Sequence, residues 1–132
     1  MTKPGGMPLP QMLFGFDGRI RRRDFWLWSF ANLAAGLTVI GVAGVLAILT
    51  VAYTQSYRYF FGLSVAAVIA MVPFGWVIMA LQVKRQHDIG HSMQRLVNFI
   101  PFLGWIWVIG ECYLREGMAG DNAYGPSPKV LK

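Results

Sequence analysis

The sequence is poor in charged residues and in cysteine. Charged residues make up 14% of the 132-residue chain, and hydrophobic residues make up 55%. Soluble domains average roughly 25% charged and about 45–50% apolar residues. A composition this far from the soluble average indicates a membrane protein. Cys112 is the single cysteine, so one chain cannot form an internal disulfide or a metal site built on several thiolates.

Acidic residues are also few. The chain has six of them against twelve lysines and arginines, which gives a net charge of +6. A basic balance of this kind raises nucleic acid as a partner, but the basic residues crowd at the edges of the apolar runs instead of forming one face. We therefore expect no nucleic-acid partner.

The chain is rich in long apolar stretches. They predict an all-α, polytopic membrane protein with about three transmembrane helices. Residues 1–132 would form one integral-membrane domain. A helix needs roughly 17–25 apolar residues to cross a bilayer. The predicted parts are a cytoplasmic or interfacial segment, three spans and a polar tail: 1–24, 25–52, 60–83, 96–114 and 115–132. Pro73 in the second span predicts a kink there.

The third stretch is only just long enough to cross a bilayer, and it contains Pro101 and Gly104. Two spans followed by a re-entrant third segment are therefore the alternative fold. The two folds differ in the side of the membrane on which the tail lies, and the sequence leaves that side open.

The distribution of basic residues predicts the orientation. With the amino terminus in the cytoplasm and three crossings, eight basic residues lie inside and four outside, as the positive-inside rule requires. The re-entrant alternative improves the split to eleven against one. In both cases the arginines before the first span and the polar segment Lys84–Arg95 share the cytoplasmic face.

Asp88 in this polar segment is the carboxylate that we expect to meet the arginines. Arg19, Arg22 and Arg85 would gather around it, because a carboxylate accepts strong guanidinium hydrogen bonds. In the structural version of this hypothesis, the cluster only clamps the start of the first span to the end of the second. In the functional version, remaining guanidinium groups and His87 also bind the phosphate of an anionic lipid.

The histidines of this segment also raise metal binding and catalysis. His87 and His91 are four residues apart, the spacing of a metal pair on a helix, but Gly90 lies between them and no third ligand is in reach. Ser92 lacks the flanking glycines of a nucleophile elbow. We therefore expect no metal, no cofactor, no catalytic residue and no enzymatic activity.

Three sequence motifs occur in order over nearly the whole chain. They are Phe16-x-Gly18-Arg19-x-x-Arg22-x-x-Phe25-Trp26, Arg85-x-His87-Asp88-x-Gly90-x-Ser92 and Gly120-x-Asn122-x-Tyr124-Gly125-x-x-Pro128. With these motifs the chain resembles the small bacterial inner-membrane proteins of the domain of unknown function 805 family, the YhaH-like proteins.

The resemblance implies a multi-pass protein of the bacterial inner membrane with a few helices, and it implies no established activity. It also singles out Asn122, Tyr124 and Gly125 in the tail. The chain departs from the family pattern at Met93-Gln94-Arg95, where Gly-Trp-Trp is usual, and at Ser127, where an acidic or amide residue is common.

Two classes of function remain. The first is a scaffold or accessory protein without catalytic activity, which binds anionic lipid headgroups, another membrane protein or a second copy of itself. The alternative is an oligomeric small-solute or ion transporter, with Pro73, Asn98 and Glu111 along its path. Glu111 lies one helical turn from Arg115, and an ion pair between them is the competing explanation for this acid.

Overall fold

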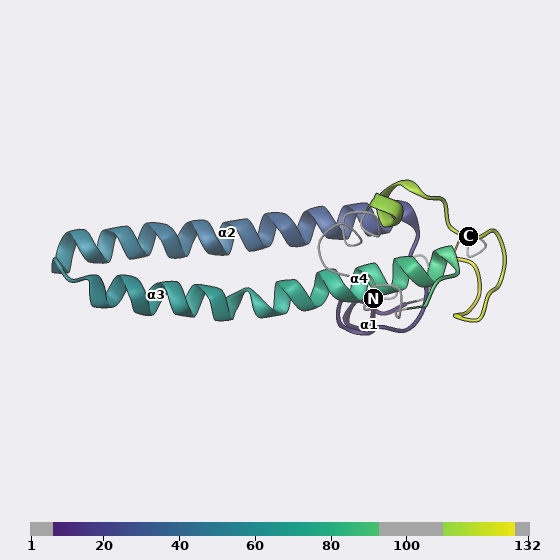
Figure 1. Cartoon of the computed structure of the whole chain (residues 1–132), viewed down its shortest axis with the longest axis horizontal. Coiled ribbons are helices and arrows are strands. Elements are labelled where there is room, and N and C mark those ends of the chain that lie inside the picture. Colours follow the sequence, from purple (N-terminus) through teal and green to yellow (C-terminus); the bar gives the residue numbers. More distant parts are fainter. Residues whose placement is uncertain (1–6, 93–109, 129–132) are drawn as a thin grey trace. The chain divides into compact units, whose positions relative to one another are not determined.

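The computed structural model describes residues 7–92 and 110–128, and most of these are helical (Figure 1). The helices in chain order are α1 (Leu9–Phe14), α2 (Arg22–Thr54), α3 (Tyr57–Ala70) and α4 (Val72–Ile89). Residues 110–114 form a further helical segment, and an isolated antiparallel bridge joins Asn122 to Gly125. The predicted all-α class is confirmed.

Among the described residues, two stretches of helix are long and apolar enough to cross a membrane, Arg22–Thr54 and Tyr57–Ile89. Only 11% of the most apolar part of each is buried, and large aliphatic side chains such as Leu37, Ile48 and Val68 are more than half exposed. Soluble monomers rarely expose apolar surface on this scale. The first two predicted spans therefore correspond to helices suited to lipid. Most of the predicted third span lies outside the described residues, so that span stays a prediction.

The predicted second span consists of two consecutive helices, because Pro73 interrupts it. Proline has no N–H to donate to the carbonyl of Ile69, and its ring crowds that carbonyl. α3 accordingly ends at Ala70 and Met71 caps it, with its N–H 3.2 Å from the Ala67 oxygen. Pro73 then lies in the first turn of α4, where a missing N–H leaves no gap in the helix.

The chain forms two compact units. The hairpin unit is Phe30–Trp76, and the terminal unit combines Met1–Ser29 with Val77–Lys132. In the hairpin unit, hydroxyl groups bond within their own helix, as Thr38 does with the Ala34 oxygen and Ser64 with the Phe60 oxygen. Polar groups in lipid have to be satisfied in this internal way.

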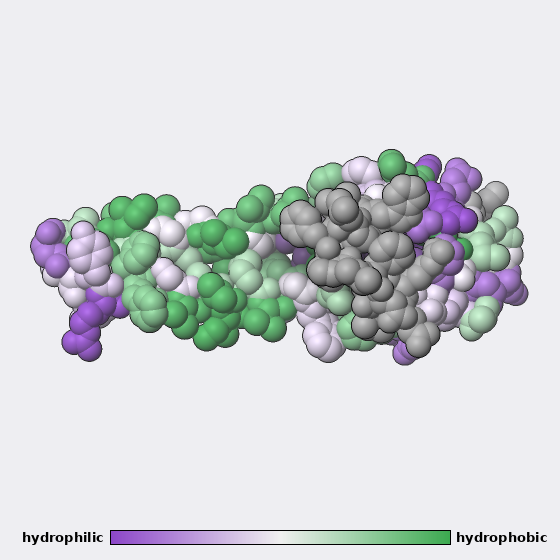
Figure 2. Space-filling model, in the orientation of Figure 1, coloured by the Kyte–Doolittle hydropathy of each residue, from purple (hydrophilic) through white to green (hydrophobic). Residues whose placement is uncertain are grey.

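The turn between α2 and α3 is polar. Tyr53, Tyr57 and Tyr59 are 92%, 78% and 57% exposed around it, which is the arrangement of an aromatic belt at a membrane surface. Gln55 in the turn adopts a positive φ of 53°. Figure 2 shows hydrophobic residues along the flanks of α2 and α3 and hydrophilic residues at this turn.

The contact between α2 and the start of α4 depends on a small residue and an amide. The Asn32 side-chain amide donates to the Phe74 carbonyl at 3.1 Å. A Cβ atom at Gly36 would lie 3.7 Å from the Phe74 ring, whereas one at Gly41 would meet nothing within 4 Å. Position 36 therefore has room for a methyl group but not for a longer side chain, whereas position 41 is open.

A matched pair of substitutions tests this contact. Gly36→Leu should lower the free energy of unfolding by about 1–3 kcal/mol, because the longer side chain must displace the Phe74 ring. Gly41→Leu should change it by about 0.5 kcal/mol or less. Unfolding in mixed detergent micelles, followed by far-UV circular dichroism, measures both. Equal effects at the two positions would contradict the packing described.

Candidate functional site

The terminal unit has its own hydrophobic core, which joins the start of α2 to the end of α4. Phe25, Leu81 and Cys112 are fully buried in it. The edge of the Tyr113 ring packs against the Phe25 ring with 4.8 Å between the ring centroids. The Trp26 indole donates to the Tyr113 carbonyl at 3.0 Å. This core fixes residues 110–114 against both long helices.

The last two turns of α4 are buried although they are charged. Lys84 and Arg85 are 0% exposed, and Asp88 is 2% exposed. Buried charges are costly unless they are paired and hydrogen-bonded. The Lys84 ammonium donates to the carbonyl oxygens of Met12, at 2.9 Å, and of Gly15. It thereby satisfies carbonyls at the end of α1, which have no partner within that helix.

Asp88 lies between two buried arginines. Its Oδ1 accepts from Nε of Arg19 at 3.1 Å, and Nη2 of Arg19 lies at the same distance. Its Oδ2 accepts from Nη1 of Arg85. The arginine side chains are only 1% and 0% exposed. One carboxylate thus connects the segment before α2 to the end of α4.

The remaining donors of Arg19 bind the backbone of the tail. Nη1 donates to the carbonyl oxygens of Gly120, at 2.6 Å, and Gly125, at 3.1 Å. Nη2 donates to the Met118 carbonyl at 2.8 Å, and the Met118 N–H donates to the Asp88 carbonyl at 2.9 Å. Every nitrogen of the Arg19 guanidinium is therefore engaged, and the tail is wrapped around it.

Arg85 has the same role for residues 112–115. Its Nε donates to the Cys112 carbonyl at 2.9 Å, and its Nη2 donates to the Arg115 carbonyl. The last carbonyls of a helix have no intrahelical partner. Arg85 therefore satisfies the end of this helical segment while it pairs with Asp88.

The tail motif closes over His87. Asn122 donates its side-chain amide to the His87 carbonyl at 2.8 Å, and its Oδ1 accepts the Tyr124 N–H at 2.9 Å. The Tyr124 ring stacks on the His87 imidazole, with centroids 3.9 Å apart and planes 3° from parallel. Nδ1 of His87 lies 3.2 Å from the Gly18 carbonyl, and Gly18 itself has a φ of 91°, which favours glycine. The three sequence motifs thus meet in one place.

Arg22 is the predicted cluster member that the structure places elsewhere. It donates to the Leu114 carbonyl at 3.1 Å and lies 3.9 Å from the Glu116 carboxylate, with a half-exposed side chain. Arg19, Arg85, His87 and Asp88 come together, and Asn122, Tyr124 and Gly125 join them. We call these seven residues the arginine network.

Sequence reasoning missed several contributors to the arginine network. A Cβ atom at Gly117 would overlap the Asp88 carboxylate, so this position accepts only glycine while Asp88 keeps its place. Most other missed partners are backbone carbonyls, which have no side-chain signature in a sequence. The glycines of the tail were the available signal, but loops in general are rich in glycine.

The described residues, 7–92 and 110–128, contain no group of three His, Cys, Asp or Glu residues that could hold a metal ion. His87 uses its ring to bond Gly18 and stack on Tyr124, as described above. The arrangement around Asp88 can hold the chain together by electrostatics and hydrogen bonds.

Replacing Asp88 tests the arginine network. Asp88→Asn should lower the free energy of unfolding by about 3–5 kcal/mol, because two buried guanidinium groups lose their counter-charge. Glu116→Gln is the control, and it should cost at most about 1 kcal/mol because that pair is exposed. Unfolding in detergent gives both values. Hydrogen exchange should show loss of protection at Met118 in Asp88→Asn alone, and unchanged protection would contradict the network.

Comparison with known proteins identifies the family. A family model described as "Protein of unknown function (DUF805)" matches residues 13–126. The inner membrane protein YhaI of Escherichia coli is 32% identical over 87% of this chain and 86% of its own length. The inner membrane protein YhaH of Escherichia coli is 31% identical over 88% of each chain. No solved structure matches. With near full-length similarity to these relatives, the chain belongs to the DUF805 family of inner-membrane proteins.

Proposed function

We propose that this protein is a non-catalytic accessory protein of the inner membrane, which works by binding lipid headgroups or a membrane partner. The two apolar helices anchor it in the bilayer. The terminal unit, which the arginine network holds together, is the binding platform at the membrane surface.

The main support for this proposal is that the polar groups of Arg19 and Asp88 in the arginine network already have hydrogen-bond partners within the chain. All three guanidinium nitrogens of Arg19 and both oxygens of Asp88 are bonded to atoms of the chain itself. A catalytic or transport site has to offer polar groups to a substrate, whereas these groups are occupied and buried. Such a network favours the structural version of the arginine clamp and a role in building a platform.

The contacts of the tail support a topology in which both ends of the described chain share one side of the membrane. Asn122 bonds to His87, and Arg19 bonds to Gly120, so the segment before α2, the end of α4 and the tail have to be on the same face. The positive-inside rule favours the cytoplasm for this face, because eleven basic residues would then lie inside and Arg58 outside. This supports two full crossings over three.

Exposed arginines support a contact with anionic lipid. Arg22 and Arg23 are exposed at the beginning of α2, next to Trp26. Each basic residue near an anionic leaflet contributes about 1 kcal/mol of attraction, and tryptophan is suited to the headgroup level. We therefore expect the exposed arginines to contact lipid, because Arg19 and Arg85 are buried in the network.

Glu111, which the transport alternative places along its path, is held in an ion pair. Arg115 Nη1 lies 2.5 Å from the Glu111 carboxylate, one helical turn away. Asn98 lies outside the described residues. Binding is therefore the better supported function.

Cysteine labelling tests the proposed topology. In a Cys112→Ser background, single cysteines at the exposed positions of Gln11, Thr54 and Ala123 report on three parts of the chain. A membrane-impermeant maleimide should label positions 11 and 123 only in inverted vesicles and position 54 only in right-side-out vesicles. Labelling of position 123 from the periplasmic side would contradict the proposal that the tail and the segment before α2 share the cytoplasmic face.

Flux measurements separate binding from transport. Purified protein reconstituted into liposomes should pass protons and potassium ions no faster than empty liposomes do, because no polar path is proposed through the apolar helices. Glu111→Gln should behave in the same way. A flux in the wild type that Glu111→Gln abolishes would replace the proposed binding function with transport.

A further inference from the structure

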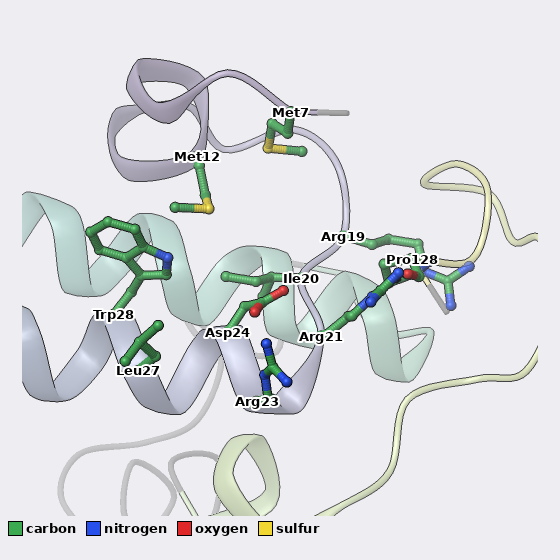
Figure 3. A pocket seen from close by; sticks show the side chains of 10 residues that line it. All are labelled: Met7, Met12, Arg19, Ile20, Arg21, Arg23, Asp24, Leu27, Trp28 and Pro128. Carbon is green, nitrogen blue, oxygen red and sulfur yellow. Dashed lines mark hydrogen bonds between the residues drawn. The ribbon is translucent and has the colours of Figure 1, made fainter. Parts of the chain in front are cut away.

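A cavity of about 150 Å³ lies in the terminal unit, where the chain enters α2. One wall comes from residues 19–21 and from the start of α2, and Met7, Met12 and Pro128 complete the lining. Figure 3 shows Met7 and Met12 facing Ile20, Asp24 and Trp28 across the cavity. The cavity lies outside the arginine network except at Arg19, whose guanidinium is saturated.

The lining of the cavity changes from polar to apolar along α2. Arg21, Arg23 and Asp24 supply the polar end, and Leu27 and Trp28 supply the apolar end one turn further along the helix. The apolar run of the first span begins at the same place in the sequence. The lining therefore has the polarity gradient of the membrane interface.

Besides Arg19, which is saturated within the arginine network, two cationic side chains line the cavity, and they are held differently. Nε of Arg21 donates to the Pro128 carbonyl, so the tail positions this guanidinium at the cavity wall. Arg23 is exposed, and within residues 7–92 and 110–128 the structure shows no ion pair or hydrogen bond of its side chain. A guanidinium group binds phosphate through two parallel hydrogen bonds. Arg23 is thus available for an anion that enters the cavity.

The size and charge of the cavity limit what can occupy it. A water molecule takes up about 30 Å³ in the liquid, so the cavity has room for a group of several non-hydrogen atoms but not for acyl chains. Two arginines favour a phosphate. Asp24 would repel a bare phosphate, but its carboxylate accepts a hydrogen bond from an ammonium or hydroxyl group beside that phosphate.

We propose that this cavity binds the phosphodiester of an inner-leaflet phospholipid whose headgroup carries a hydrogen-bond donor. Arg21 and Arg23 face the phosphate, Asp24 accepts from the headgroup ammonium or hydroxyl, and the acyl chains follow Leu27 and Trp28 into the bilayer. The inference deepens the proposed platform and rests on it, because it names the lipid chemistry that the platform recognises.

Lipid retention measured by native mass spectrometry tests the site. The full-length protein in detergent is offered phosphatidylethanolamine, phosphatidylglycerol and phosphatidylcholine with matched acyl chains. The first two should be retained about tenfold better than phosphatidylcholine, whose quaternary ammonium has no donor for Asp24. Phosphatidylethanolamine and phosphatidylcholine have the same net charge, so equal retention of these two would contradict the donor requirement.

Variants separate the phosphate contact from the headgroup contact. Arg23→Ala should lower retention of phosphatidylethanolamine and phosphatidylglycerol about tenfold, and Arg23→Lys should restore part of it. Arg58→Ala removes the same charge at the exposed turn of the hairpin unit and should leave retention unchanged. Asp24→Ala removes the acceptor and should abolish the discrimination against phosphatidylcholine, because the amide oxygen of an asparagine would still accept from the headgroup. Wild-type-like unfolding of each variant in detergent shows that it is folded.

Two results would overturn the site. Equal losses in Arg23→Ala and Arg58→Ala would mean that lipid is held by diffuse charge. Unchanged selectivity in Asp24→Ala would rule out the headgroup contact. The cysteine labelling distinguishes these failures from failure of the platform. A chain with position 123 in the cytoplasm that retains all three lipids equally keeps the platform and loses this site.

Discussion

The Asp88 carboxylate is the group on which the terminal unit depends. It is 2% exposed and shared by two arginines that are themselves buried. Taking an ion out of water costs several kcal/mol even after the protein relaxes. One carboxylate cannot neutralise two guanidinium groups, so backbone carbonyls have to supply the rest of the negative potential. The carbonyls come from the tail and from residues 112–115, which therefore pack against the end of α4.

The two units satisfy their polar groups by different means. In the hairpin unit, hydroxyls bond within their own helix, and Asn32 bonds across to the Phe74 carbonyl. A bilayer requires this self-sufficiency because its core offers no water. In the terminal unit, long cationic side chains reach across the chain to carbonyls that have no helical partner. The division follows the sequence, in which apolar runs alternate with short charged segments.

The sequence predicted the helical class and the two long apolar helices, because hydrophobic length is a local property. It also placed Arg19 and Arg85 beside Asp88, since a carboxylate among arginines has few other partners. The sequence could not predict the carbonyl acceptors, which every residue carries. It could not show that Gly117 makes room for Asp88 either, because that requirement comes from a tertiary contact.

Arg22 shows why charge complementarity alone placed one residue of the cluster wrongly. Gly18, with a φ of 91°, turns the chain before α2, so Arg19 lies outside the helix and can extend inward to Asp88. Arg22 begins α2, and successive helical residues point about 100° apart. Arg22 and Arg23 therefore face different surroundings, Leu114 and Glu116 for the first and the cavity wall for the second. Four arginines that form one basic run in the sequence thus differ in the structure: Arg19 is buried in the arginine network, whereas Arg22 and Arg23 are exposed.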